Sequence, residues 1–228
     1  MSDAPKKMSA LQMAAAMGDR LPLMDDLPQG ALDLAEATRD FVAAVVATDL
    51  DDASRREMAE RIRAFTVRLR ERQRDPLIVL TRTREGWIEN FTQAGWGRWN
   101  PQSLRIRFDP AQMRFPEPGA LPQAVEITAT CTLTEAHSGP PQRAHGGVVM
   151  TLLDEALGVA AAVAGAGGMT AGMNVRFKAA TPLGVPLTLR SRYERSEGRK
   201  RFVSGEVIAG DVTTAQAEGI FIAPAQDG

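Results

Sequence analysis

The longest apolar segment of the chain runs from Gly147 to Ala164, in the middle of a series of alternating segments. Within it only Thr151, Asp154 and Glu155 are polar. A segment of this length that is apolar on every side predicts a helix buried in the core. A carboxylate on such a helix must be paired, neutralised or functional, because an unpaired buried charge is strongly destabilising. Asp154 is therefore the first candidate functional residue.

Apolar and polar residues alternate on both sides of this helix, which predicts strands. The expected strands are 104–108 and 125–133 before the helix, and 169–177, 187–193, 201–208 and 213–222 after it. Short connections among the last four strands imply mostly antiparallel neighbours. One long apolar helix needs a sheet to cover it. The pattern therefore predicts an α+β fold in which an antiparallel sheet wraps around the helix.

Residues 30–74 space their apolar positions by threes and fours, which predicts two helices. The second is expected to begin at the capping-box pattern Ser54-Arg-Arg-Glu57 and to end at Asp75-Pro76. Its arginine-rich face is interpreted as the solvated side of an amphipathic helix. We therefore expect an N-terminal tail and helical extension over residues 1–75 and a second domain over residues 76–225.

His145-Gly146-Gly147 stands where the apolar helix is expected to begin. Backbone N–H groups at a helix start have no intrahelical acceptor and can point at an incoming negative oxygen. Asp154 follows Gly146 by eight residues, which puts it on nearly the same azimuth but about 12 Å further along the helix. One Asp154 cannot easily reach a group held at its own Gly146. The spacing therefore suggests a site made between two chains packed antiparallel.

The composition narrows the partners and the compartment. The formal net charge of −1 gives no global argument for binding nucleic acid or an anionic membrane, and neither partner is expected. The single cysteine, Cys131, excludes an internal disulfide and suits a reducing compartment, so we expect a cytoplasmic protein. Its alternating position predicts a buried structural residue rather than a catalytic thiol.

The sequence from His145 to Gly158, HGGVVMTLLDEALG, resembles the helix of hotdog-fold acyl-CoA thioesterases of the phenylacetate-degradation (PaaI-like) type. Thr170–Phe177 with the following Ala180-Thr-Pro182, and Asn100-Pro101 ahead of the first long strand, are similar to neighbouring elements of that family. The resemblance covers about residues 95–222 and implies a hotdog fold with the helical segment as an extension.

The resemblance also implies a site and a reaction. The backbone N–H of Gly146 binds the thioester carbonyl oxygen, and the Asp154 carboxylate of a partner subunit activates water or attacks the thioester. His145 orients the thioester or a water, or simply caps the helix. Thr170 orients the attacking water, or is simply a β-branched residue that begins a strand. Coenzyme A leaves as part of the substrate, without a metal or a redox cofactor. The residues expected to bind substrate are Gly147, Asn100, Asn174, Arg176, Lys178, Arg199 and Lys200, the basic ones because coenzyme A carries phosphates.

The resemblance implies a homodimer or a dimer of dimers that binds an acyl-CoA. Two other functions stay open. One is a non-catalytic, acyl-CoA-sensing transcriptional regulator that uses the basic N-terminal helix, although a sensor has no need for the carboxylate of Asp154. The other is a hydratase or dehydratase on the same fold. Family members often carry a polar residue six positions before the motif histidine, where this chain has Gly139. Trp96 and Trp99 are interpreted as core packing or as the cap of an acyl pocket.

Overall fold

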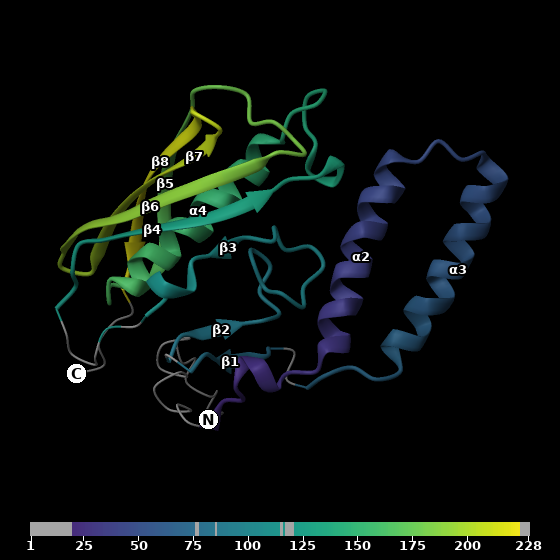
Figure 1. Cartoon of the computed structure of the whole chain (residues 1–228), viewed down its shortest axis with the longest axis horizontal. Helices are drawn as coiled ribbons and strands as arrows, with labels where there is room; N and C mark the ends of the chain where they lie inside the picture. The colour runs from purple at the N-terminus through teal and green to yellow at the C-terminus, as the bar shows by residue number, and fades with distance from the viewer. Residues whose placement is uncertain (1–19, 76–77, 85, 115, 117–120, 224–228) are drawn as a thin grey trace, which may run out of the picture.

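The computed structural model describes residues 20–75, 78–84, 86–114, 116 and 121–223 (Figure 1). The expected tail before residue 20 lies outside this described part. The helices are α2 (Gln29–Ala47), α3 (Asp52–Arg70) and α4 (Gly146–Val163), with short 3-10 turns between elements. The strands are β1 (Leu80–Arg82), β2 (Ile88–Asn90), β3 (Arg107–Phe108), β4 (Val125–Thr132), β5 (Met169–Phe177), β6 (Pro186–Glu197), β7 (Lys200–Ala209) and β8 (Val212–Ile222).

Six strands form one antiparallel sheet in the order β3-β4-β6-β7-β8-β5, and α4 packs against one of its faces (Figure 1). The strands β1 and β2 form a separate small sheet. The helices α2 and α3 stand beside this domain as an N-terminal extension. The predicted α+β fold, an antiparallel sheet around one long apolar helix with a helical extension, is therefore confirmed.

Two glycines of the sheet let α4 approach closely. Leu157 of α4 is fully buried, and its methyl groups lie 3.0 Å and 3.1 Å from where a Cβ at Gly205 on β7 or Gly219 on β8 would stand. The Ser191 hydroxyl of β6 donates a 2.9 Å hydrogen bond to the carbonyl of Ala156. Glycine in a strand permits such close contact, because it has no side chain to hold a neighbour away. These contacts fix α4 along and around its axis, and Asp154 lies one turn before them.

The helix α4 is covered on one side only, which corrects the expectation that it is buried all round. Gly147, Met150 and Thr151 are exposed and Asp154 is half-buried, all along one stripe of the helix. The strand β5, at the edge of the sheet, is also largely exposed. By length and composition alone α4 could cross a membrane, a property that core helices share. One side of the apolar helix packs against the sheet, and the other side forms the exposed stripe.

Two predicted boundaries were wrong. The helix α3 begins at Asp52 rather than at Ser54, because the Asp51 carboxylate accepts hydrogen bonds from both the backbone N–H and the hydroxyl of Ser54. Aspartate is a strong N-cap residue, so it starts the helix before the expected capping box. The strand expected over 104–108 is reduced to β3, because Arg105 has a φ of 47°, which interrupts the extended backbone.

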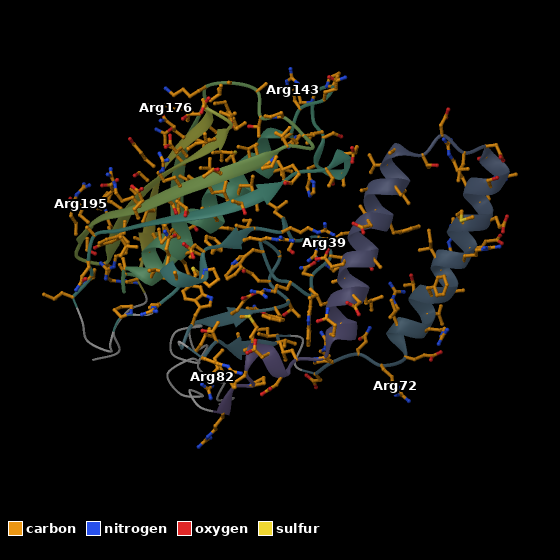
Figure 2. The ribbon with its side chains drawn as sticks, viewed as in Figure 1. Arg39, Arg72, Arg82, Arg143, Arg176 and Arg195 are labelled. Atoms are coloured by element: carbon orange, nitrogen blue, oxygen red, sulfur yellow. The ribbon has the colours of Figure 1, made fainter. Side chains whose placement is uncertain are left out.

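Arg39 anchors the N-terminal extension to the domain (Figure 2). Its side chain is only 9% exposed and donates hydrogen bonds to the carbonyls of Gly97 (3.3 Å), Arg98 (3.0 Å) and Asn100 (2.6 Å) and to the Ser103 hydroxyl (2.9 Å). These contacts cross the expected boundary at residue 75, which stays a prediction. The extension is therefore attached through α2, on the loop that follows β2.

Replacing Arg39 with alanine should detach α2 while leaving the sheet intact. The Arg39→Ala change removes the donor of several part-buried carbonyl oxygens, so we expect a loss of about 2–3 kcal/mol in the free energy of α2 docking. Hydrogen exchange should accelerate in α2 and stay slow in α4. Arg55→Ala, which removes an exposed arginine of α3, is the matched control. Unchanged exchange in α2 would show that Arg39 is not the anchor.

Candidate active site

The start of α4 leaves one backbone donor open. His145 is the N-cap residue, and its Nδ1 accepts a 3.0 Å hydrogen bond from the N–H of Gly147. Neutral His145 therefore carries its proton on Nε2. Among the described residues no acceptor contacts the N–H of Gly146. Of the two motif glycines, Gly146 alone thus offers its N–H to a ligand, whereas the N–H of Gly147 serves the cap.

The surroundings of this donor are apolar and tightly packed. A Cβ at Gly146 would lie 3.4 Å from the ring of Phe177, the last residue of β5, whose side chain is 52% exposed. A Cβ at Gly139 would lie 2.7 Å from the Cα of His145. The position at which relatives often carry a polar side chain is thus filled by backbone contact. His137, two residues before Gly139, could supply a polar group instead, but it is occupied in its own turn, where Nδ1 accepts from the Thr134 N–H.

Asp154 and Thr170 are brought together by the packing of β5 beside α4. The Thr170 hydroxyl donates a 2.7 Å hydrogen bond to Oδ1 of Asp154. Thr170 is exposed and Asp154 is half-buried, so the pair lies at the surface on the open stripe of α4. Among the described residues no other side chain binds this carboxylate. One of its oxygens is held in place, and the other has no hydrogen-bond donor among the described residues.

The Gly146 donor and the Asp154 carboxylate form two separate half-sites in one chain. They are eight residues apart on a continuous helix, which corresponds to about 12 Å. Phe177 marks the first half-site and Thr170 marks the second, at opposite ends of β5. A thioester of a few ångströms cannot contact both at once within one chain.

Glu155 is a functional candidate that the sequence analysis did not single out. Its Oε2 accepts a 2.7 Å hydrogen bond from Nε2 of Gln93, and a Cβ at Gly95 would lie 1.9 Å from Oε1. Burial raises the pKa of the Glu155 carboxyl to about 7, and the charge of neighbouring Asp154 contributes to the rise. Its only sequence signal was a second acid within the apolar helix, because Gln93 and Gly95 lie in a loop without a recognisable pattern.

The basic residues expected to meet coenzyme A do not form one cluster in the chain. Arg176 pairs with Gln216 on β8, whereas Lys200 pairs with Ile222 at the other end of that strand. Six residues of strand separate the two positions by about 20 Å. Arg176 and Arg195 accordingly stand well apart over the sheet (Figure 2). The cause is strand direction, since β5 and β7 both pair antiparallel with β8 and therefore run parallel to each other, which puts the end of β5 and the start of β7 at opposite ends of the sheet.

Lys178 follows β5 at the Arg176 end, and Arg199 precedes β7 at the Lys200 end. Asn174 and Arg176 line a hollow on the outer face of the sheet, opposite α4. Asn100 uses both ends of its amide in its own loop, with the Thr92 carbonyl as acceptor and the Gln102 N–H as donor. Substrate binding by these residues stays a prediction.

The aromatic and sulfur side chains are packed in the core. Trp96 contacts the rings of Trp87 and Phe108, with centroids 6.3 Å and 5.1 Å away. Trp99 stacks edge-on against a phenylalanine, Phe91, at 5.6 Å. Cys131 is buried, and burial raises its thiol pKa to about 12. The core interpretation of the tryptophans and the structural interpretation of Cys131 both fit this packing.

Comparisons with known proteins agree with this architecture. The sequence profile of the thioesterase superfamily matches residues 142–216. The acyl-coenzyme A thioesterase THEM4 of Xenopus laevis is 36% identical over 86 residues, which cover 37% of this chain and 39% of the relative. THEM4 of Bos taurus is 38% identical over 86 residues, 37% of this chain and 35% of the relative. The chain therefore spans less than half the length of these curated relatives.

A solved structure extends the likeness beyond the matched segment. The crystal structure of a thioesterase superfamily protein superimposes with a TM-score of 0.71 at 28% identity, covering 88% of this chain and 97% of that one. The likeness therefore includes most of the N-terminal extension as well as the sheet and α4. With its sheet-wrapped helix, this chain has the hotdog fold, and it is similar to thioesterase superfamily proteins in the segment that carries the HGG motif.

Proposed function

We propose that the protein is an acyl-CoA thioesterase, which hydrolyses a thioester to a free acid and coenzyme A. The observation that carries this proposal is the carboxylate of Asp154, which the Thr170 hydroxyl holds on the exposed stripe of α4. At the start of the same helix, the N–H of Gly146 has no acceptor among the described residues. All three residues lie in the segment that matches the thioesterase superfamily. The relatives named acyl-coenzyme A thioesterases support the substrate class.

Each half-site supplies one part of thioester hydrolysis. The Gly146 N–H, at the positive end of the helix dipole, donates to the carbonyl oxygen and stabilises the negative charge that develops there. The free oxygen of Asp154 takes a proton from water while the water oxygen bonds to the carbonyl carbon. The C–S bond then breaks, the acid is released, and the departing thiolate of coenzyme A recovers the proton. Thr170 keeps the other carboxylate oxygen occupied, which orients the base.

We further propose that each complete site forms between two chains. In the described part of the molecule β5 pairs only with β8, so its outer edge is open, and such edges pair readily with another strand. Antiparallel pairing of β5 with the β5 of a second copy would set Thr170 of one chain near Phe177 of the other. The Asp154 of one chain would thereby meet the Gly146 of the other.

The same pairing accounts for two other features. Met150, Met169 and Phe177 are exposed apolar side chains on α4 and β5, and a second copy at this edge would cover them. It would also bring the Lys200 end of one chain toward the Arg176 end of the other. The basic residues that are separated in one chain would then flank one substrate.

Glu155 is proposed as a positioning residue beside the base. Its carboxyl, with a pKa of about 7, is held by Gln93 under the backbone of Gly95. A neutral Glu155 fixes the loop after β2 on α4 without placing a second negative charge next to Asp154. Below about pH 7 the protonated Glu155 therefore adds no negative charge beside Asp154.

Loss of the Asp154 carboxylate should abolish turnover. We expect Asp154→Ala and Asp154→Asn to lower kcat by at least about a hundredfold, the usual contribution of a general base. The assay is release of free thiol from acyl-CoA thioesters of increasing chain length and from phenylacetyl-CoA. Glu60→Gln, which changes an exposed carboxylate of α3, is the control and should stay active. Binding of acyl-CoA without turnover of any thioester by the unmodified protein would instead favour the sensor.

Complementation between variants should reveal a shared site. Gly146 is the first residue of α4, where proline fits a helix, so Gly146→Pro removes the proposed N–H donor and preserves the helix. Alone, Gly146→Pro and Asp154→Ala should both be inactive. Mixed after subunit exchange, half of the dimers combine both variants and contain one intact site, so about a quarter of wild-type activity should return. No recovery in a mixture proven to contain heterodimers would place the two groups of one site in one chain.

The stability contributed at Glu155 should fall as pH rises. Its folded pKa of about 7 lies above its ordinary value of 4.5, so the folded chain holds the proton more firmly. The free energy of unfolding then decreases between these two pH values and levels off above 7. Glu155→Gln should remove this decrease, which amounts to about 2–3 kcal/mol. Denaturant unfolding of both proteins at pH 5 and pH 8 measures it, and parallel pH profiles would contradict the assignment.

A further inference from the structure

The helices α2 and α3 present an apolar surface that nothing in the described part of the chain covers. Only Ala35 is buried among the residues of α2, and no residue of α3 is buried. Figure 1 shows the two helices projecting from the domain, with α3 on the far side from the sheet. The large apolar side chains exposed here are Leu34, Phe41, Val42, Val45, Val46, Leu50, Met58, Ile62, Phe65, Val67 and Leu69.

These side chains follow the spacing of helices that pack in bundles. Met58, Ile62, Phe65 and Leu69 are separated by four, three and four residues, which puts them in one row along α3. Phe65 is 63% exposed despite its position in the middle of this row. A two-helix hairpin with such a row needs further helices to bury it, and a second hairpin would complete a four-helix bundle.

We propose that the apolar face of the α2–α3 hairpin binds the same face of a second copy of this chain. The two hairpins form a four-helix bundle in which α3 of each copy lies against α2 of the other. A twofold axis parallel to the helices gives this arrangement and closes the interface, because both copies then use the same surface. The partner of each hairpin is therefore the identical hairpin of a second copy.

The charge distribution favours α3 against α2 over α3 against α3. The helix α3 carries six arginines and three acidic residues, so two α3 helices in contact would place like charges beside each other. The single arginine of α2, Arg39, is buried against the domain, and Glu36 and Asp40 of α2 pair with Arg105. The α2 of another copy therefore adds no exposed positive charge beside α3, and avoiding like charges selects orientation and partner at an interface.

The available area is sufficient for a specific contact. Each helix has 19 residues and is therefore about 28 Å long. Two helices packed side by side in the bundle are about 20 Å wide, so one hairpin face covers about 550 Å² and two copies would bury about 1,100 Å². This total passes the roughly 1,000 Å² expected of a biological interface. The face of one copy lies at the upper end of the roughly 300–600 Å² of the largest patch on a typical monomer.

This contact is independent of the proposed pairing of β5. The extension docks on the loop before β3, and β3 and β5 are the opposite edges of the six-stranded sheet (Figure 1). One surface completes the proposed catalytic site and the other joins copies through their extensions. Loss of the hairpin contact should therefore change the assembly and leave the chemistry intact.

Sedimentation tests the contact with the full-length protein. Phe65→Asp together with Leu69→Asp places two charges in the apolar row, so the mass of the assembly should fall about twofold. Thioesterase turnover should be retained, whereas Asp154→Ala should lose turnover and keep the wild-type mass. Val67→Asp changes an equally exposed apolar residue on the other side of α3 and should keep the mass. An unchanged mass of the Phe65→Asp, Leu69→Asp protein would overturn the proposal.

Disulfide trapping tests the arrangement directly. In the proposed bundle Phe65 of one copy lies level with Leu34 of the other, because α2 and α3 run antiparallel from their connection at residues 48–51. Oxidation should join a tagged Leu34→Cys chain to an untagged Phe65→Cys chain, but not to a Val67→Cys chain. In the Leu34→Cys, Phe65→Cys double variant the bond should likewise link different chains. A bond formed only within single chains would show that the hairpin closes on itself and would overturn the proposal.

Discussion

The close seating of α4 on the sheet is the contact on which the rest of the structure depends. Leu157 reaches the backbone of β7 and β8 because Gly205 and Gly219 carry no side chain. This contact fixes the rotation of an almost uniformly apolar helix, which by its sequence alone could turn any side toward the sheet. The side left open is the one that carries Asp154. A structural requirement, burial of Leu157, thereby determines where the carboxylate is presented.

The open stripe explains how an acid is tolerated on such a helix. Asp154 is half-buried rather than enclosed, and its single hydrogen bond comes from a residue of the edge strand β5. Desolvation is therefore limited, and the carboxylate keeps one free oxygen. Glu155 illustrates the other outcome, because its neighbouring carboxyl is packed under Gly95 and has a pKa of about 7. The two adjacent acids thus differ in packing, because Asp154 lies on the exposed stripe and Glu155 lies under the loop after β2.

Much of the fold could be predicted from residue patterns. Alternation identified β4 to β8 and the apolar run identified α4, because each of these elements buries one face. The helix start and the resemblance to thioesterases together singled out Gly146, Asp154 and Thr170, and the contact between Thr170 and Asp154 comes from the structure. The start of α3 was misplaced because Ser54 and Asp51 are both good caps and only contacts decide between them. The role of Gln93 depends on the loop after β2, which contacts α4 but shows no regular spacing of apolar residues that would predict this contact.

The exposure of α4 and the distribution of the basic residues could not be predicted for a different reason. The exposure depends on strand order, and the sequence gives no signal that β5 pairs with β8 at the edge of the sheet. The distribution of the basic residues depends on β5 and β7 running in the same direction. Arg39 was likewise not recognised as the anchor of the extension, because its carbonyl acceptors lie about 60 residues away along the chain. Local residue patterns carry no information about which distant segments come into contact.

In the proposed site one chain binds the thioester oxygen while another chain supplies the base. A crystal structure of the protein with a non-hydrolysable acyl-CoA analogue would show both contacts. We expect the carbonyl oxygen of the analogue to accept a hydrogen bond from the Gly146 N–H, and the nearest carboxylate to be Asp154 of a second copy beside its own Thr170. An analogue bound with its carbonyl away from Gly146, or next to Asp154 of the same chain, would show that the site is not shared in this way.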